Sequence, residues 1–207
     1  MNKLLVTAMA MALSHSVNAK TLTIGIDLSG SNPLLRHENF AYSASTYVAA
    51  EISRLKSGDT VQIKTFGARS DAVNLINRRL SISRHNRPEK VAQSAAQFIR
   101  SLPGRANTAQ SSTNLVAWLE FTDGFACGAS GEILVITDAI ESSTYVDAKD
   151  LLSGKKGLPA PEVDLKGCTL IFYGLGAGHP PRQVKAIRKA WRRWAEQAGV
   201  IFKAIIP

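Results

Sequence analysis

The chain has 207 residues, of which 45% are hydrophobic and 20% are charged. This composition suits one folded domain with a real core, and it excludes a disordered chain and a fibre. The formal net charge of +9 is compatible with nucleic acid, anionic lipid headgroups or an acidic protein as a partner, and it does not choose among them.

The first nineteen residues have the pattern of a secretory signal peptide. A short basic start precedes an apolar run from Leu4 to Leu13, and small residues precede an expected cut between Ala19 and Lys20. The apolar run is about half of the ~20 residues that a membrane-spanning helix needs, and no later segment is long and apolar enough to span. We therefore expect residues 1–19 to be removed and residues 20–207 to form one domain, periplasmic or secreted.

Strand-like and helix-like segments alternate along the rest of the chain. The strand-like segments are nearly continuous in apolar character, which is typical of parallel sheets covered on both faces. The pattern predicts an α/β domain, doubly wound, with a mostly parallel six-stranded sheet, one antiparallel edge strand and helices on both faces. In chain order, we expect a strand over Thr21–Leu28, a helix from Pro33 to about Leu55, strands over Thr60–Phe66 and Val73–Ser83 joined through Gly67–Asp71, helices over Pro88–Ser101 and Asn114–Phe121, a strand over Glu132–Thr137, a helix around Thr144–Leu152, a strand over Cys168–Tyr173, a helix over Pro181–Ala198 and a last strand over Val200–Ile206.

The two cysteines, Cys127 and Cys168, favour a disulfide because the chain is expected to be exported and their number is even. Two buried free thiols are the alternative. Cys127 lies just before one predicted strand and Cys168 begins the next. If those strands are parallel neighbours, both cysteines lie at the same edge of the sheet.

Oxygen-bearing side chains gather at the opposite ends of the predicted strands. Asp27 ends the first strand and is followed by Ser29 and Ser31, Thr113 lies in a polar loop, and Asp138 follows a later apolar strand. Hard divalent cations such as Mg²⁺ choose oxygen ligands of this kind. Ligands of open α/β sheets bind beyond the carboxyl ends of strands, where the strand order reverses. If the two strands are central neighbours, the two carboxylates converge.

This set of residues resembles the metal-ion-dependent adhesion site of von Willebrand factor A domains, and the resemblance covers the whole mature chain. It implies that Ser29, Ser31 and Thr113 contact a divalent cation directly or through water, and that Asp27 and Asp138 hold it in the same two ways. Mg²⁺ is the expected ion, with Mn²⁺ or Ca²⁺ as alternatives. The resemblance also implies a protein partner whose Glu or Asp completes the coordination shell.

Two positions depart from the pattern of the family. Ala139 stands where glycine often follows the last aspartate, and Ser111-Ser112 stand where glycines are frequent before the threonine. Neither change removes a ligand atom. Small exported domains of this family occur in bacterial envelope assemblies, including conjugation and secretion systems, and the resemblance permits such a setting for this chain.

No nucleophile, base and orienting group assemble in the sequence, so we do not expect an enzyme. A phosphatase of the haloacid-dehalogenase type needs a second aspartate where Ser29 stands. The glycines at 174, 176 and 178 follow a late strand and lack dinucleotide-loop spacing, so a connecting loop is the expectation. A metal-assisted hydrolase remains the least favoured alternative.

The last helix offers a different kind of site. An apolar stripe that includes Trp191 and Trp194 faces the core, while basic residues that include Arg188 and Arg192 crowd the other side. The basic side is either a solvated surface or a docking surface for an acidic partner or anionic lipid. The alternative function for the chain is therefore an electrostatic binding module in which this helix binds anionic lipid or nucleic acid and the metal is incidental. Nucleic acid is disfavoured because both tryptophans point inward and an exported protein seldom meets it. We place His37 about one turn into the first helix, where it could contact a partner.

Overall fold

The computed structural model describes residues 19–68, 75–122, 124–125, 127–128 and 131–207. The body of the predicted signal peptide lies outside these residues. So do most of the Gly67–Asp71 connection and the beginning of the predicted Val73–Ser83 strand. None of the helices in the described residues is long and apolar enough to cross a membrane.

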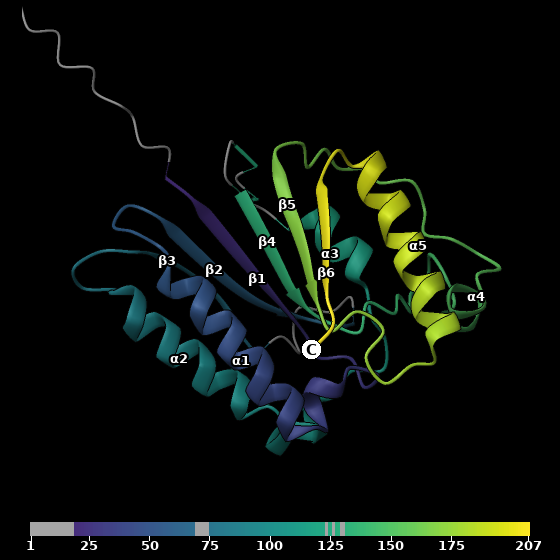
Figure 1. The fold of residues 1–207 in the computed structure, drawn as a ribbon, viewed down its shortest axis with the longest axis horizontal. Helices are drawn as coiled ribbons and strands as arrows, with labels where there is room; N and C mark the ends of the chain where they lie inside the picture. The colour runs from purple at the N-terminus through teal and green to yellow at the C-terminus, as the bar shows by residue number, and fades with distance from the viewer. Residues whose placement is uncertain (1–18, 69–74, 123, 126, 129–130) are drawn as a thin grey trace, which may run out of the picture.

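Six strands of the described chain form one sheet in the order β3-β2-β1-β4-β5-β6 (Figure 1). Every neighbouring pair is parallel except β2 and β3, which are antiparallel. The predicted fold class is confirmed, including the antiparallel edge strand. The strands are β1 (Thr21–Asp27), β2 (Thr60–Phe66), β3 (Asn77–Ser81), β4 (Gly131–Ile136), β5 (Cys168–Tyr173) and β6 (Ile201–Ile205).

Helices cover both faces of the sheet, and each face has its own apolar core (Figure 1). On one face, α1 (Glu38–Ser53) and α2 (Pro88–Arg100) pack over β1 and β2. On the other face, α3 (Leu115–Phe121) and α5 (Pro181–Gln197) pack over β4 and β5, with α4 (Ala148–Ser153) beside α5.

Burial explains which strands are central. All seven residues of β1 are buried, because helices cover it on both faces and strands flank it on both sides. The residues of β3 are exposed or half-buried, and two of them are arginines. Charged side chains on an edge strand discourage pairing with another chain.

Two predicted helices begin later than the sequence pattern suggested. The segment expected as one helix from Pro33 is a short 3-10 helix, η1 (Pro33–Leu35), followed by α1 from Glu38. His37 is therefore the residue before α1 and not one turn into it, which corrects the predicted position. The fourth helix begins at Ala148 rather than near Thr144, because the Asp147 side chain accepts a hydrogen bond from the Lys149 N–H and caps it there.

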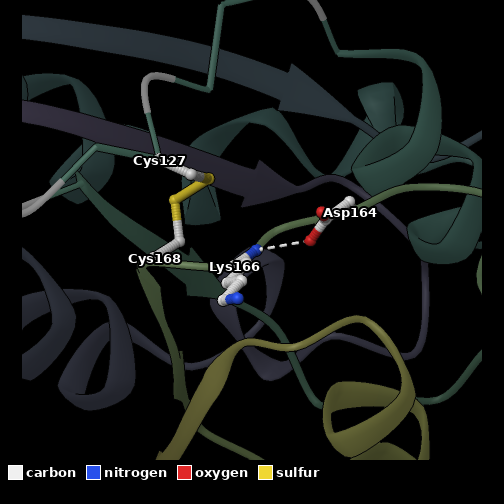
Figure 2. The surroundings of a disulfide bond; sticks show 4 residues. All are labelled: Cys127, Asp164, Lys166 and Cys168. Carbon is white, nitrogen blue, oxygen red and sulfur yellow. Dashed lines mark hydrogen bonds between the residues drawn. A yellow bond between two sulfur atoms is a disulfide. The ribbon is translucent and has the colours of Figure 1, made fainter.

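The predicted disulfide is present between Cys127 and Cys168, whose Cα atoms are 4.6 Å apart (Figure 2). Cys168 begins β5 and pairs in register with Gly131, the first residue of β4. The bond therefore lies at the amino ends of the parallel strands, opposite the carboxyl ends of β1 and β4. Gly167 has a φ of +90°, and a Cβ there would lie 2.4 Å from the Cys127 carbonyl oxygen, so this approach requires glycine.

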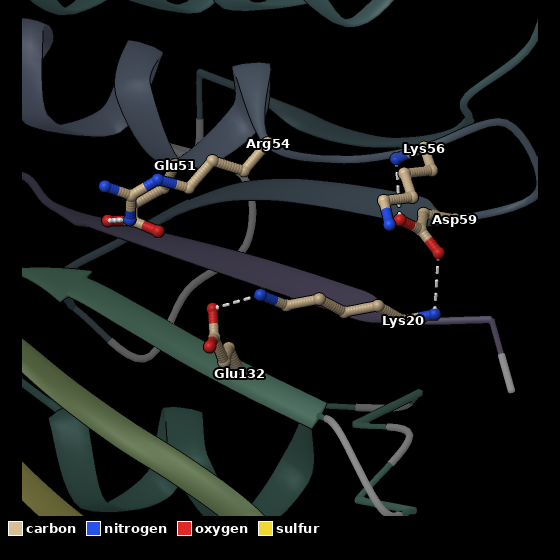
Figure 3. Close-up of polar contacts among 6 residues, drawn as sticks. All are labelled: Lys20, Glu51, Arg54, Lys56, Asp59 and Glu132. Carbon is tan, nitrogen blue, oxygen red and sulfur yellow. Dashed lines mark hydrogen bonds and ion pairs between the residues drawn. The ribbon is translucent and has the colours of Figure 1, made fainter.

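The beginning of β1 is fixed by polar contacts (Figure 3). The backbone N–H of Lys20 donates to Asp59 Oδ1 at 2.8 Å, and its Nζ lies 2.7 Å from a carboxylate oxygen of Glu132 on β4. The other oxygen of Asp59 accepts from the Lys56 N–H. These contacts join the residue before β1 to the turn before β2 and to β4.

Candidate metal centre

The candidate metal ligands lie where the order of the sheet reverses. The chain passes from β1 to β2 and β3 on one side, and then returns to place β4, β5 and β6 on the other side. β1 and β4 are parallel neighbours, so Asp27 and Asp138 follow adjacent strands at the same edge. This is the position at which open α/β sheets bind ligands.

Asp27 is fully buried, and both of its carboxylate oxygens accept hydrogen bonds. The Ser29 N–H donates to Oδ1 at 2.8 Å, and the Thr137 hydroxyl donates to Oδ2 at 2.7 Å. Burial and the nearby charge of Asp138 together raise the pKa of Asp27 to about 7, against the hydrogen bonds from Thr137 and Ser29, which lower it. The negative charges at this site thus repel each other in a region from which water is excluded.

Asp138 is buried and only partly satisfied. Its Oδ1 accepts the Ile140 N–H at 3.0 Å, while Oδ2 has no hydrogen-bond partner within the described part of the chain. Burial raises the pKa of Asp138, and the Ile140 N–H, the Ser31 hydroxyl and the charge of His179 lower it. A buried carboxylate oxygen without a partner is costly, so this atom needs a proton or a cation beside it.

The two predicted serine ligands lie next to each other. Ser29 Oγ and Ser31 Oγ are 3.3 Å apart, with Ser29 buried and Ser31 exposed. The loop after β1 thus holds the two serine hydroxyls next to each other and the Ser29 N–H against Asp27.

Backbone pairing joins the loop that carries Thr113 to both of these loops. Thr113 and Ser142 exchange two backbone hydrogen bonds of 3.0 Å, which holds Thr113 against the segment after Asp138. Gln110, three residues earlier, exchanges backbone hydrogen bonds with Leu28 and Gly30. Thr113 is buried, so its hydroxyl is enclosed within this cluster of loops.

Ala139 adopts a backbone conformation that favours glycine. Its φ is +62°, the left-handed region that a side chain disfavours. Its N–H donates to the Thr137 hydroxyl at 2.9 Å, and its carbonyl accepts from Trp191 Nε1 at 2.8 Å. These bonds hold the strained residue in place and join α5 to the segment that carries Asp138.

Sequence reasoning missed several residues that organise this site. The Asn32 side chain donates to the carbonyls of Asp27 at 2.8 Å and Ile136 at 3.3 Å, so it joins the ends of β1 and β4. Glu141 is buried and accepts from the N–H groups of Leu115 and Val116 at the start of α3. The Asn32-Pro33 dipeptide, typical of a turn, was the one local signal; the contacts of Glu141 are too distant in sequence to be predicted.

The other predicted binding residues lie elsewhere. His37 is exposed at the beginning of α1, and its side chain makes no capping hydrogen bond. Arg188 and Arg192 lie on α5, where they line a pocket against β6 and not the loops around Asp27. Trp191 and Trp194 are buried, as the sequence predicted.

No protein-family model matches the chain, and no curated protein matches it. Among solved structures, the chain is similar to the conserved hypothetical protein BatB from Bacteroides thetaiotaomicron, with 15% identity, a TM-score of 0.48 and 91% of each chain covered. It is also similar to the pilus adhesin SpaC from Lactobacillus rhamnosus GG in an open conformation, with 11% identity and a TM-score of 0.47. That likeness covers 93% of this chain and 28% of SpaC. Neither is close enough to carry a conclusion about function.

The donor set suits a hard cation. In the described residues, no group of three or more His, Cys, Asp or Glu side chains gathers as a metal cluster would. A cation at this site would therefore depend on two carboxylates and on neutral hydroxyls, a combination that suits Mg²⁺ with several retained waters. A cation would fit beside Asp138 Oδ2, which lies near a second buried carboxylate and lacks a hydrogen-bond partner among the residues that the structure describes.

Proposed function

We propose that this chain is an exported von Willebrand factor A-like domain that binds a partner protein through a divalent metal ion. The observation that carries the proposal is the buried Oδ2 of Asp138, which has no hydrogen-bond partner in the described residues, beside the buried carboxylate of Asp27. Burying two carboxylates close together costs folding free energy. A protein retains such a pair where a bound cation offsets that cost or where the pair serves a function.

Each residue of the site has a distinct role in this proposal. The carboxylates of Asp27 and Asp138 supply negative charge, and their own hydrogen bonds fix their orientation. Ser29, Ser31 and Thr113 supply neutral oxygens, which leave the bound ion electrophilic. Ser31 is the exposed member of the set and lies at the side from which a partner would approach.

The partner would present a Glu or Asp side chain. A cation held by few anionic ligands attracts one more carboxylate strongly, and a neutral or basic side chain cannot replace it. The proposed setting is a periplasmic assembly of the bacterial envelope, such as a conjugation or secretion system. The disulfide and the predicted signal peptide are compatible with such a compartment.

Calorimetric titration of residues 20–207 with MgCl₂ and MnCl₂ tests the metal site directly. We expect saturable binding that is lost in Asp27→Ala and kept in Asp164→Asn, an exposed aspartate at the opposite end of the domain. Capture of partner proteins from an envelope extract with and without EDTA tests the function. Capture that ignores EDTA, together with the absence of metal binding, would refute the proposal.

A further inference from the structure

The outer edge of β6 is open beside the basic helix α5 (Figure 1). β6 is the last strand of the sheet, and no other strand in the described residues pairs with its outer side. A pocket of about 380 Å³ lies between β6 and α5. Its lining is Arg188, Arg192, Ala195 and Glu196 from the helix, and Val200, Phe202 and Ala204 from the segment of β6.

The hydrogen-bonding groups of β6 that point away from the sheet belong to the residues that line this pocket. The Ile205 carbonyl accepts from the Gly174 N–H, so Ile205 directs its backbone groups toward β5. Successive residues of a strand point their backbone groups to alternate sides. Phe202 and Ala204 therefore present N–H and C=O groups that no strand of the described residues pairs with, and an extended chain could add there as a further strand.

The α5 side of the pocket carries arginine side chains that can bind an anion. Arg188 Nε is buried and has no hydrogen-bond partner in the described part of the chain. Arg192 lies one turn further along the helix and lines the same pocket, while Glu196 is the acidic member of the lining. A buried guanidinium N–H without an acceptor is costly, and an incoming carboxylate would satisfy it.

The positive charge around the pocket favours an acidic binding partner. The chain carries a formal charge of +9, and exposed Lys189 and Arg193 flank the pocket residues on α5. A second copy of this chain would bring more positive charge to the same place, so pairing of β6 with another β6 is disfavoured. An acidic segment is complementary to it.

We propose that the β6 edge and α5 form a second docking site, independent of metal, that binds an extended acidic segment of a partner protein by strand addition. Backbone hydrogen bonds join the segment to Phe202 and Ala204, and a Glu or Asp side chain on the α5 side pairs with Arg188 and Arg192. Side chains on the other face of the segment lie beside Ile201, which is 62% exposed.

The test uses a designed peptide in which valine and glutamate alternate, acetyl-(Val-Glu)₃-amide, because alternate residues of a strand face the same side. Residues 20–207 are titrated with the peptide in EDTA and followed by amide NMR. We expect saturable shifts at Phe202 and Ala204. Arg188→Gln and Arg192→Gln should each weaken binding roughly tenfold or more, since hydrogen bonds between charged groups are the strong ones.

Three controls separate this proposal from simpler explanations. Arg193→Gln removes an equal charge from an exposed position of α5 and should change the affinity less than threefold. The peptide with lysine in place of glutamate should not bind. Two further peptides carry N-methyl groups, one at all valines and the other at all glutamates. Only one of the two should lose affinity for the domain, because only alternate amides of the added strand face β6.

The outcomes that overturn the proposal are distinct. Equal weakening by the Arg193 and Arg188 variants would mean diffuse charge attraction without a site. Undiminished binding of both methylated peptides would exclude strand addition. The proposal that an acidic segment binds at this edge would be overturned if the native domain did not bind the peptide. It would also be overturned if sedimentation showed a dimer of the domain that buries Phe202. None of these results depends on the metal, so the proposed metal site can fail or stand separately.

Discussion

The two buried carboxylates at the ends of β1 and β4 predict how folding stability depends on pH in the absence of metal. Burial and the neighbouring Asp138 raise the pKa of Asp27 from 3.8 to about 7. The folded chain therefore binds this proton more tightly than the unfolded chain does. Stability is then highest at acidic pH and falls as the pH rises from about 4 to 7.

The size of this loss follows from the shift in pKa. Each pKa unit corresponds to about 1.4 kcal/mol, so ionising Asp27 in the metal-free fold costs on the order of 4 kcal/mol. A cation that neutralises the site should recover much of this cost. Millimolar Mg²⁺ should therefore stabilise the domain more at pH 8 than at pH 5, because protons and the cation compete for the same carboxylates.

Urea unfolding of residues 20–207 in EDTA, from pH 4 to pH 8, measures the effect, and the same series in MgCl₂ measures the recovery. Asp27→Asn should reduce the pH dependence, leaving the part that comes from other buried carboxylates, and abolish the magnesium response. Asp164→Asn makes the same chemical change at an exposed residue and should behave like the native domain. If Asp27→Asn and the native domain have the same pH slope in EDTA, the reasoning from burial and repulsion is refuted.

Three further predictions concern stability. The disulfide closes a sequence separation of 41 residues, so replacing Cys127 and Cys168 by serine should cost roughly 4 kcal/mol in the chain-entropy model, measured by urea unfolding. Gly25→Val should destabilise the domain by roughly 1–3 kcal/mol, because a Cβ at Gly25 would lie 2.6 Å from the Trp118 ring; tryptophan fluorescence and thermal unfolding report it. Burial raises the pKa of Glu141 to about 7, so its ionisation should lower the free energy of unfolding of the native domain by about 3 kcal/mol between pH 4 and pH 7. Glu141→Gln should not show this part of the decrease when unfolding is measured in EDTA.

Each of these predictions has a clear contrary result. A reduced or serine-substituted domain as stable as the native one would mean that the Cys127–Cys168 bond adds little beyond local packing. Unchanged tryptophan fluorescence in Gly25→Val would show that the position of the Trp118 ring does not depend on a glycine at residue 25. If Glu141→Gln lost as much stability between pH 4 and pH 7 as the native domain, the responsible proton would lie on another group.

The fold class was predictable because burial leaves a direct trace in the sequence. Strands β1, β4 and β5 are buried on both faces, and their continuous apolar character predicts a parallel sheet. Helix beginnings were less predictable. Pro33 suits the first turn of either an α-helix or a 3-10 helix, and the Asn32 side chain, which caps Leu34 and joins two strand ends, decided between them.

The candidate ligands were identifiable because each ends a strand or lies in a polar loop. Their local sequence does not contain the environment that gives them their chemistry. Thr137 donates to Asp27 across 110 positions of the sequence, and Glu141 reaches the start of α3 across 26. Such contacts depend on which strands are neighbours, and short motifs carry no information about that.

By itself, the sequence determined the alternation of strands and helices, the single antiparallel edge, the partners of the disulfide and the positions of the oxygen-bearing residues, since periodicity and strand ends are local properties. Only the tertiary structure decided that Asp138 has one oxygen without a hydrogen-bond partner among the described residues and that Ala139 is held at a positive φ. It also decided that Arg188, which lines the pocket beside β6, has a buried Nε without a hydrogen-bond partner in the described residues. Burial and hydrogen bonding of a side chain are set by segments far away in the chain, which meet only when the sheet assembles.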